Sequence, residues 1–137
     1  MGRYGSLEDP FREWDDLSPF TLEKTGYEFM TDSPIRYLAV TLGGDVLGYL
    51  WASETDDAAD YLPRPDGGAV GLDAGYVWGP RLNRAHEEGL TPMELLLRWK
   101  GEPEHPEGGG ILPHAEVRPA PSVDALEFIA DSPNYEN

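Results

Sequence analysis

The chain has 137 residues, and its 26 acidic side chains outnumber its 10 Lys and Arg side chains, so the formal net charge at pH 7 is −16. Such a charge repels the phosphates of nucleic acids and anionic membrane surfaces, and it attracts basic proteins. The absence of cysteine excludes a disulfide framework, a thiolate zinc site and a cysteine nucleophile.

The length fits one domain over residues 1–137, with a loose tail at 132–137. The opening residues lack the apolar core of a signal peptide, and no apolar run reaches the roughly 18 residues that a membrane span needs. We therefore expect a cytoplasmic protein that binds neither a membrane nor nucleic acid.

The first part of the chain predicts one helix followed by strands. Asp9 and Pro10 fit an N-cap and a first helical position, which predicts a short helix over residues 10–17. Aromatic and β-branched residues then predict strands at 27–30, 35–42 and 46–53. The two glycines and the aspartate at 43–45 supply the turn chemistry of an antiparallel hairpin.

The next segment predicts a helix and then a loop. Thr55 precedes two aspartates, a pattern typical of a capped helix start, and Pro63 ends the pattern. We therefore expect a brief helix over residues 56–62. Residues 63–75 are rich in Gly and Pro and are predicted to form a loop that faces a partner or an active site.

Residues 80–100 predict two helices joined by a tight glycine turn. Pro80 fits a first helical position, and Gly89 fits a left-handed C-cap. Thr91 and Glu94 form a capping box at the start of the second helix. That helix is apolar around most of its circumference, which is typical of a buried helix and not of a DNA recognition helix. We expect an αα-corner in the core.

The C-terminal part predicts a loop, an edge strand and a helix. Residues 101–113 are rich in Gly and Pro, and 115–121 contain prolines that only an edge strand tolerates. Ser122 caps a last helix over 123–131. The elements together predict an α+β fold, in which an antiparallel hairpin or meander packs against several short helices that include the αα-corner.

Three histidines raise the question of a metal site. His105 and Glu107, and likewise His114 and Glu116, form pairs that could supply nitrogen and oxygen ligands. The glycine run between the pairs is a poor platform for a preorganised site. We expect solvated loop residues, no bound metal and no cofactor, and the alternative of a metal site stays open.

One stretch resembles a known family of enzymes. The segment "LAVTLGGDVLGYLWA" is similar to the second and third strands of GNAT-type acetyltransferases, in which a glycine-acid turn joins two strands. Arg64, Gly67 and Ala69 match the R/Q-x-x-G-x-G/A spacing of that family. The resemblance implies a small acyl-CoA-dependent acetyltransferase whose loop N–H groups hold the pyrophosphate of coenzyme A.

Acidic runs beside aromatic residues favour a different function. Aromatic anchors rimmed by carboxylates suit a basic protein partner, because the charge speeds association and the aromatics contribute burial. We therefore expect a binding protein and not an enzyme, most concretely an immunity-like inhibitor of a basic, nuclease-type partner. The preferred contact set is Asp56, Asp57, Asp60 and Tyr61. The second set is Trp14, Asp15 and Asp16.

Overall fold

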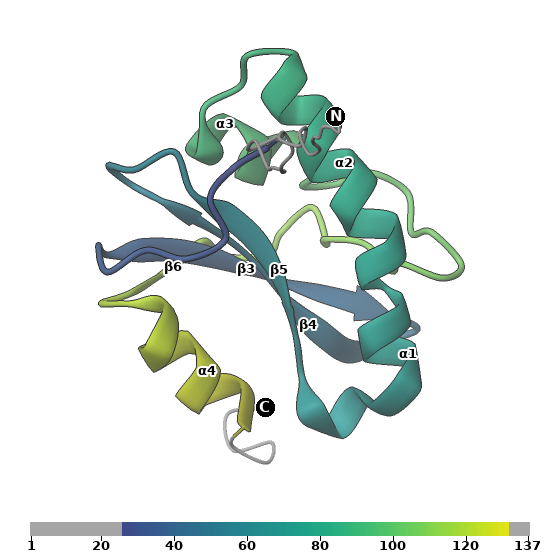
Figure 1. Cartoon of the computed structure of the whole chain (residues 1–137). Coiled ribbons are helices and arrows are strands. Elements are labelled where there is room, and N and C mark those ends of the chain that lie inside the picture. The colour runs from purple at the N-terminus through teal and green to yellow at the C-terminus, as the bar shows by residue number, and fades with distance from the viewer. Residues whose placement is uncertain (1–25, 132–137) are drawn as a thin grey trace, which may run out of the picture.

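A computed structural model describes residues 26–131, which form a four-stranded antiparallel sheet with helices on both faces (Figure 1). The strand order is β5-β4-β3-β6. The strands are β3 (Ile35–Leu42), β4 (Asp45–Ser53), β5 (Ala59–Pro63) and β6 (Arg118–Ala120). The α+β prediction is confirmed. The predicted helix over 10–17, the contact set of Trp14, Asp15 and Asp16, and the tail at 132–137 lie outside the described residues.

The predicted hairpin is formed by β3 and β4. Gly43 and Gly44 both have positive φ angles in the turn between them, a conformation that favours glycine. A β-bulge interrupts the pairing, because Leu47 has no partner on β3. A Cβ atom at the adjacent Gly48 would lie 2.4 Å from the carbonyl oxygen of Leu62 on β5, so the close approach of β5 requires glycine there.

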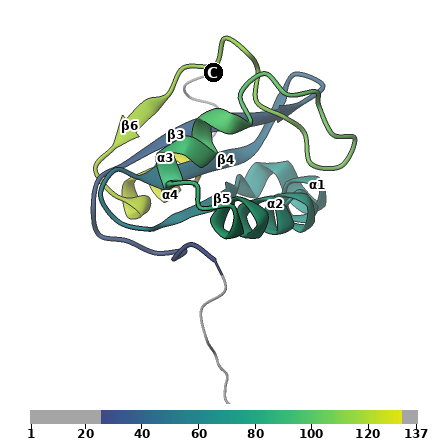
Figure 2. The same ribbon diagram turned by 90° about the horizontal axis from the view of Figure 1, so that it is seen from above.

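The alternation of side chains along β3 and β4 creates two buried faces. The helices α2 (Gly75–Glu87) and α3 (Pro92–Arg98) cover one face, and α4 (Val123–Asp131) covers the other (Figures 1 and 2). The first core contains Leu38, Val40, Leu50, Ala52, Trp78, Leu82, Leu95 and Leu96. The second contains Ile35, Tyr37, Tyr49, Trp51, Val123, Leu126 and Ala130.

The helix predicted over residues 56–62 is wrong, because Ala59–Pro63 form strand β5 and pair with β4. Ala59 and Tyr61 point into the first core, which gives the segment the two-residue period of a strand. The hydroxyl of Ser53 accepts the first free N–H groups after β4 and so organises a turn at the place where a helix start was expected.

The loop predicted over residues 63–75 is also wrong. It contains a 3₁₀ helix (Pro65–Gly67), the helix α1 (Gly68–Asp73) and the first residue of α2, which begins at Gly75. Pro80 lies inside α2, so its prediction as the first helical position is wrong as well. A Cβ atom at the buried Gly71 would lie 3.0 Å from the carbonyl oxygen of Leu47. The lack of a side chain at Gly71 therefore allows α1 to lie close to the bulge. Glycine at this position reflects close packing and does not indicate a loop.

The remaining elements agree with the sequence in part. The capping box of α3 is present, because Glu94 N–H donates to the hydroxyl of Thr91 at 3.1 Å. The helix α4 has the predicted bounds, and β6 occupies part of the predicted edge strand at 115–121. The strand predicted at 27–30 is reduced to an isolated bridge between Glu28 and Ala58.

Candidate functional site

The turn between β4 and β5 carries two residues of the preferred contact set. Asp56 and Asp57 are exposed there. The buried hydroxyl oxygen of Ser53 accepts hydrogen bonds from the N–H groups of Thr55 and Asp56, at 3.2 and 2.8 Å. Both aspartates are therefore presented on a backbone that is held in one conformation before any partner arrives.

The Asp56 carboxylate is held in its charged form. The hydroxyls of Thr31 and Ser33 donate hydrogen bonds to it. These bonds, the one from Thr31 foremost, lower the pKa of Asp56 below its ordinary value. Hydrogen bonds of this kind stabilise the ionised carboxylate over the neutral acid, so Asp56 carries a negative charge at neutral pH.

The Asp57 carboxylate contacts helix α2. Its Oδ2 atom lies 2.9 Å from Nε2 of His86, and the Tyr27 ring meets the imidazole edge-on at a centroid distance of 4.8 Å. The Tyr27 hydroxyl donates to the carbonyl of Leu90 at 2.7 Å, and burial raises its pKa to about 12. The turn is thereby tied to the connection between α2 and α3.

A pocket of about 510 Å³ lies between this turn and that connection. Asp56, Asp57 and His86 line it together with the partly buried side chains of Leu90 and Met93. The pocket combines negative charge with apolar surface. That is the composition expected at a site for a cationic group with an apolar stem, such as an arginine or lysine side chain.

Two exposed apolar residues lie beside the turn. Glu28 N–H donates to the carbonyl of Asp57 at 2.9 Å, and the Thr31 hydroxyl contacts Asp56. The intervening Phe29 and Met30 are therefore next to the turn, with 67% and 59% of their surface exposed. We call Phe29, Met30, Asp56 and Asp57 the acid–apolar patch. The sequence does not indicate the apolar half of this patch, because the pattern at 27–30 predicts an ordinary strand whose apolar side chains would be buried.

The other two residues of the preferred contact set do not belong to this surface. Tyr61 is only 7% exposed, its hydroxyl donates to the Gly71 carbonyl at 2.8 Å, and its ring stacks near Trp78. It is part of the core and offers no ring to a partner. Asp60 points to the opposite face of β5 and is half-buried, and desolvation raises its pKa.

The burial of Asp60 predicts a pH-dependent gain in stability on substitution. Above its raised folded-state pKa, the ionised carboxylate destabilises the folded chain, whereas below the unfolded value of about 3.9 both states hold the proton. We therefore expect Asp60→Asn to raise Tm at pH 7 and to leave it unchanged near pH 3. Glu127→Gln removes the same charge from an exposed position in the middle of α4 and serves as the control. An equal gain at both pH values would contradict this explanation.

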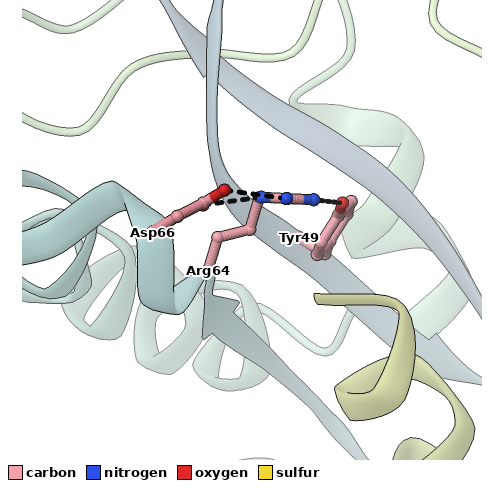
Figure 3. A network of polar contacts seen from close by, with 3 residues as sticks. All are labelled: Tyr49, Arg64 and Asp66. Atoms are coloured by element: carbon pink, nitrogen blue, oxygen red, sulfur yellow. Dashed lines mark hydrogen bonds and ion pairs between the residues drawn. The ribbon is translucent and has the colours of Figure 1, made fainter. Parts of the chain in front are cut away.

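The residues of the acetyltransferase-like motif lie in a strand-to-helix connection (Figure 3). Arg64 follows β5, Gly67 ends the 3₁₀ helix, and Ala69 lies in α1. Arg64 is 5% exposed. Its Nε and Nη2 atoms donate to the two carboxylate oxygens of Asp66 at 2.9 and 3.0 Å, and Nη1 donates to the Tyr49 hydroxyl at 2.8 Å.

These contacts raise the pKa of Arg64, with the hydrogen bonds to Asp66 as the largest cause. Asp66 also lines the adjacent pocket of about 610 Å³, together with Asp45. The lining thus contains two carboxylates and the guanidinium of Arg64, which is already engaged by Asp66, so its charge does not favour a pyrophosphate group. The geometry favours a structural role for Arg64.

The histidine pairs are not assembled into a metal site in the part of the chain that the structure describes, where no group of three or more His, Asp or Glu side chains is placed to hold an ion. Nδ1 of His105 accepts hydrogen bonds from the N–H groups of Glu107 and Gly108, at 2.9 and 3.1 Å. His105 therefore organises the backbone of its own loop. His114 and Glu116 are exposed farther along the chain.

Comparison with known proteins indicates no function for this chain. No protein-family model matches it, and no significant match is found among curated proteins or solved structures. Among the helices within residues 26–131, none has both the length and the apolar character needed to cross a bilayer.

Proposed function

We propose that the protein is a binding module that presents the acid–apolar patch to a basic protein partner. One observation carries the proposal: Asp56 and Asp57 are exposed on a turn held by Ser53, directly beside the exposed Phe29 and Met30. The preferred contact set is thereby revised, since the apolar contribution comes from Phe29 and Met30 in place of Tyr61.

Charge and apolar surface contribute to different steps of binding. The net charge of −16 and the exposed aspartates accelerate the encounter with a basic surface. Burial of the Phe29 and Met30 side chains then slows dissociation. Because the turn is organised beforehand by Ser53, Thr31 and Ser33, little conformational entropy is lost on binding.

The partner class that fits this chemistry is a nuclease or a similar enzyme with a basic active site. Such sites hold phosphate groups with Lys and Arg side chains. Asp56 and Asp57 are consecutive and exposed, so the turn presents two carboxylates to such a basic site. In this proposal the protein acts as an immunity-like inhibitor, because the turn occupies the site that the nucleic acid would enter.

Neutralising the turn tests the proposal. We expect Asp56→Asn with Asp57→Asn to slow association with the basic partner by about tenfold at low salt, with a smaller change in dissociation. The double variant Asp124→Asn with Glu127→Gln on α4 removes the same charge from exposed positions outside the patch. Each tagged form captures proteins from native lysate in parallel, and the retained protein is identified. Surface plasmon resonance then measures its association and dissociation rates, and a nuclease assay measures its inhibition.

The expected result is a basic protein that the wild type and the α4 control retain and that the turn variant loses at lower salt. Phe29→Ser is expected to accelerate dissociation of the same protein without slowing association. Equal capture by all forms would contradict the proposal, because binding would then depend on overall charge and not on the turn.

A second candidate is the acetyltransferase, and one observation favours it. A strand leads directly into Arg64 and helices follow Gly67, which is the context that the family's phosphate loop requires. The contacts of Arg64 argue against this candidate, because its guanidinium already donates to Asp66 and to the Tyr49 hydroxyl. A saturable rise of Tm with acetyl-CoA that a Gly67→Asp substitution removes would support this candidate, and no rise would eliminate it.

A further inference from the structure

A second pocket, separate from the acid–apolar patch, has the opposite charge. It has a volume of about 280 Å³ and lies between α2 and α3, where Arg81 and Arg84 come from α2 and Arg98 comes from the last turn of α3. The ring of Trp99 lines it as well. Three of the chain's ten Lys and Arg residues thus converge on one small pocket of a strongly acidic protein.

Arg81 is partly buried and lies against two tryptophan rings. Its guanidinium carbon lies 4.7 Å from the ring centroid of Trp78 and 4.0 Å from that of Trp99. Aromatic rings attract the cation but supply no oxygen acceptor for its N–H donors. Among residues 26–131, no hydrogen-bond or ion-pair partner lies within bonding distance of Arg81. Burial lowers its pKa, and the charge of Glu102 opposes that shift from farther away.

The other two arginines are weakly compensated. Arg84 is exposed and has no ion pair within residues 26–131. Arg98 lies 3.7 Å from Glu88, and both side chains are about half exposed, so this pair is weak. Glu88 is the one carboxylate that lines the pocket in the described part of the chain. The described lining of the pocket therefore contains three arginines and one carboxylate.

Helix stability alone does not explain this arrangement. Cations in the last turn interact favourably with a helix dipole, which accounts for Arg84 on α2 and Arg98 on α3. It does not account for Arg81, which lies in the middle of α2 and is stacked between rings from two segments. Nor does it account for the convergence of all three guanidinium groups on one pocket.

We propose that this pocket binds a small molecule bearing a phosphate monoester or a pair of carboxylates. The guanidinium group presents donors in a planar fork that matches two anionic oxygens, and such charge-assisted hydrogen bonds are short and strong. Arg84 and Arg98 hold the anion from the two helices, and Arg81 supplies a third, desolvated donor. Trp99 forms the apolar wall. The inference concerns residues outside the acid–apolar patch and does not depend on the proposed function.

The test is a titration of the full chain with inorganic phosphate at constant ionic strength, read by Tm and by tryptophan fluorescence. Malonate replaces phosphate in a parallel arm, because it carries two carboxylates. We expect saturable changes in the wild type and a rise of at least about tenfold in apparent Kd for the double variant Arg84→Gln with Arg98→Gln, as expected for the loss of one charge-assisted hydrogen bond or more. Both side chains are exposed, so the variant is expected to fold.

Arg36→Gln with Arg118→Gln is the matched control, since it removes the same charge from arginines outside the pocket. This control is expected to bind like the wild type. Because the chain as a whole repels anions, a saturable response requires a local site. No saturable response to either anion, or equal weakening in both double variants, would overturn the proposal. A response to one anion and not to the other would identify the ligand as a phosphate ester or as a dicarboxylate.

Discussion

Replacing Trp78 by alanine is expected to lower the free energy of unfolding by about 4 kcal/mol, the range for deleting a large buried aromatic side chain. Trp78 is fully buried on α2, between the sheet and the loop that carries Gly108. Its indole N–H donates to the Gly108 carbonyl at 2.9 Å, and its ring contacts Tyr61 and Trp99. The substitution therefore opens a cavity and leaves a buried carbonyl without its donor.

Trp78→Phe separates the effect of the cavity from the effect of the lost hydrogen bond to the Gly108 carbonyl. Phenylalanine keeps most of the ring packing but cannot donate to the Gly108 carbonyl, so we expect a loss of about 1–2 kcal/mol from the hydrogen bond and the smaller ring. Urea unfolding followed by circular dichroism measures both variants. A loss below about 1 kcal/mol for the alanine variant would mean that the loop and α2 readjust to fill the space.

Arg64→Ala is expected to lower the free energy of unfolding by about 2 kcal/mol, within the range for leaving a buried polar group without its hydrogen-bond partner, here the Tyr49 hydroxyl. The guanidinium makes three hydrogen bonds in a buried position, two to Asp66 and one to the hydroxyl of Tyr49 (Figure 3). The larger loss that is typical of a buried ion pair is not expected, because Asp66 is exposed and regains water when the arginine is removed.

This loss is expected to shrink in acid. The Arg64 hydrogen bonds lower the pKa of Asp66 in the folded chain. A depressed folded-state pKa contributes stability above the unfolded value of about 3.9, and this contribution disappears as pH falls through the folded value. Urea unfolding of the wild type and the Arg64→Ala variant at pH 7 and near pH 2.5 measures the difference. Asp66→Asn, which leaves Arg64 in place, is the control and is expected to cost less at pH 7.

The pH dependence also identifies the cause of any destabilisation. If the difference between wild type and Arg64→Ala stays constant down to pH 2.5, the loss comes from the cavity and from Tyr49, and the Asp66 pair contributes little.

Elements with local signals were predictable from the sequence. The hairpin glycines, the capping box at Thr91 and the cap at Ser122 each act within a few residues, so β3, β4, α3 and α4 have nearly the expected bounds. Strand β5 was misread because Thr55 and the following aspartates imitate a helix cap, whereas the deciding partner of the turn is the hydroxyl of Ser53. Pairing with β4 then overrides local preference.

The candidate sites were less predictable, because each joins residues that are distant in sequence. Asp56 and Asp57 were expected from charge alone, but their apolar neighbours depend on the bonding of Glu28 to Asp57 across the fold. Likewise, the helices that carry Arg81 and Arg98 were expected, but which of their faces meet is set by packing against the sheet. The hydrophobic periodicity of a sequence shows which face of an element is buried, but it does not show which other element packs against that face.

The short strand β6 has a consequence for how separate copies of the protein interact. An exposed strand edge is a template on which a second molecule can add a strand and start an aggregate. Here β6 has three residues, and Pro119 within it offers no N–H, while Thr41 farther along the neighbouring strand is already paired with Gly110. At the opposite edge, Glu28 pairs with Ala58. The β6 margin of the sheet thus resists intermolecular strand addition, which favours dispersed molecules when the protein is concentrated.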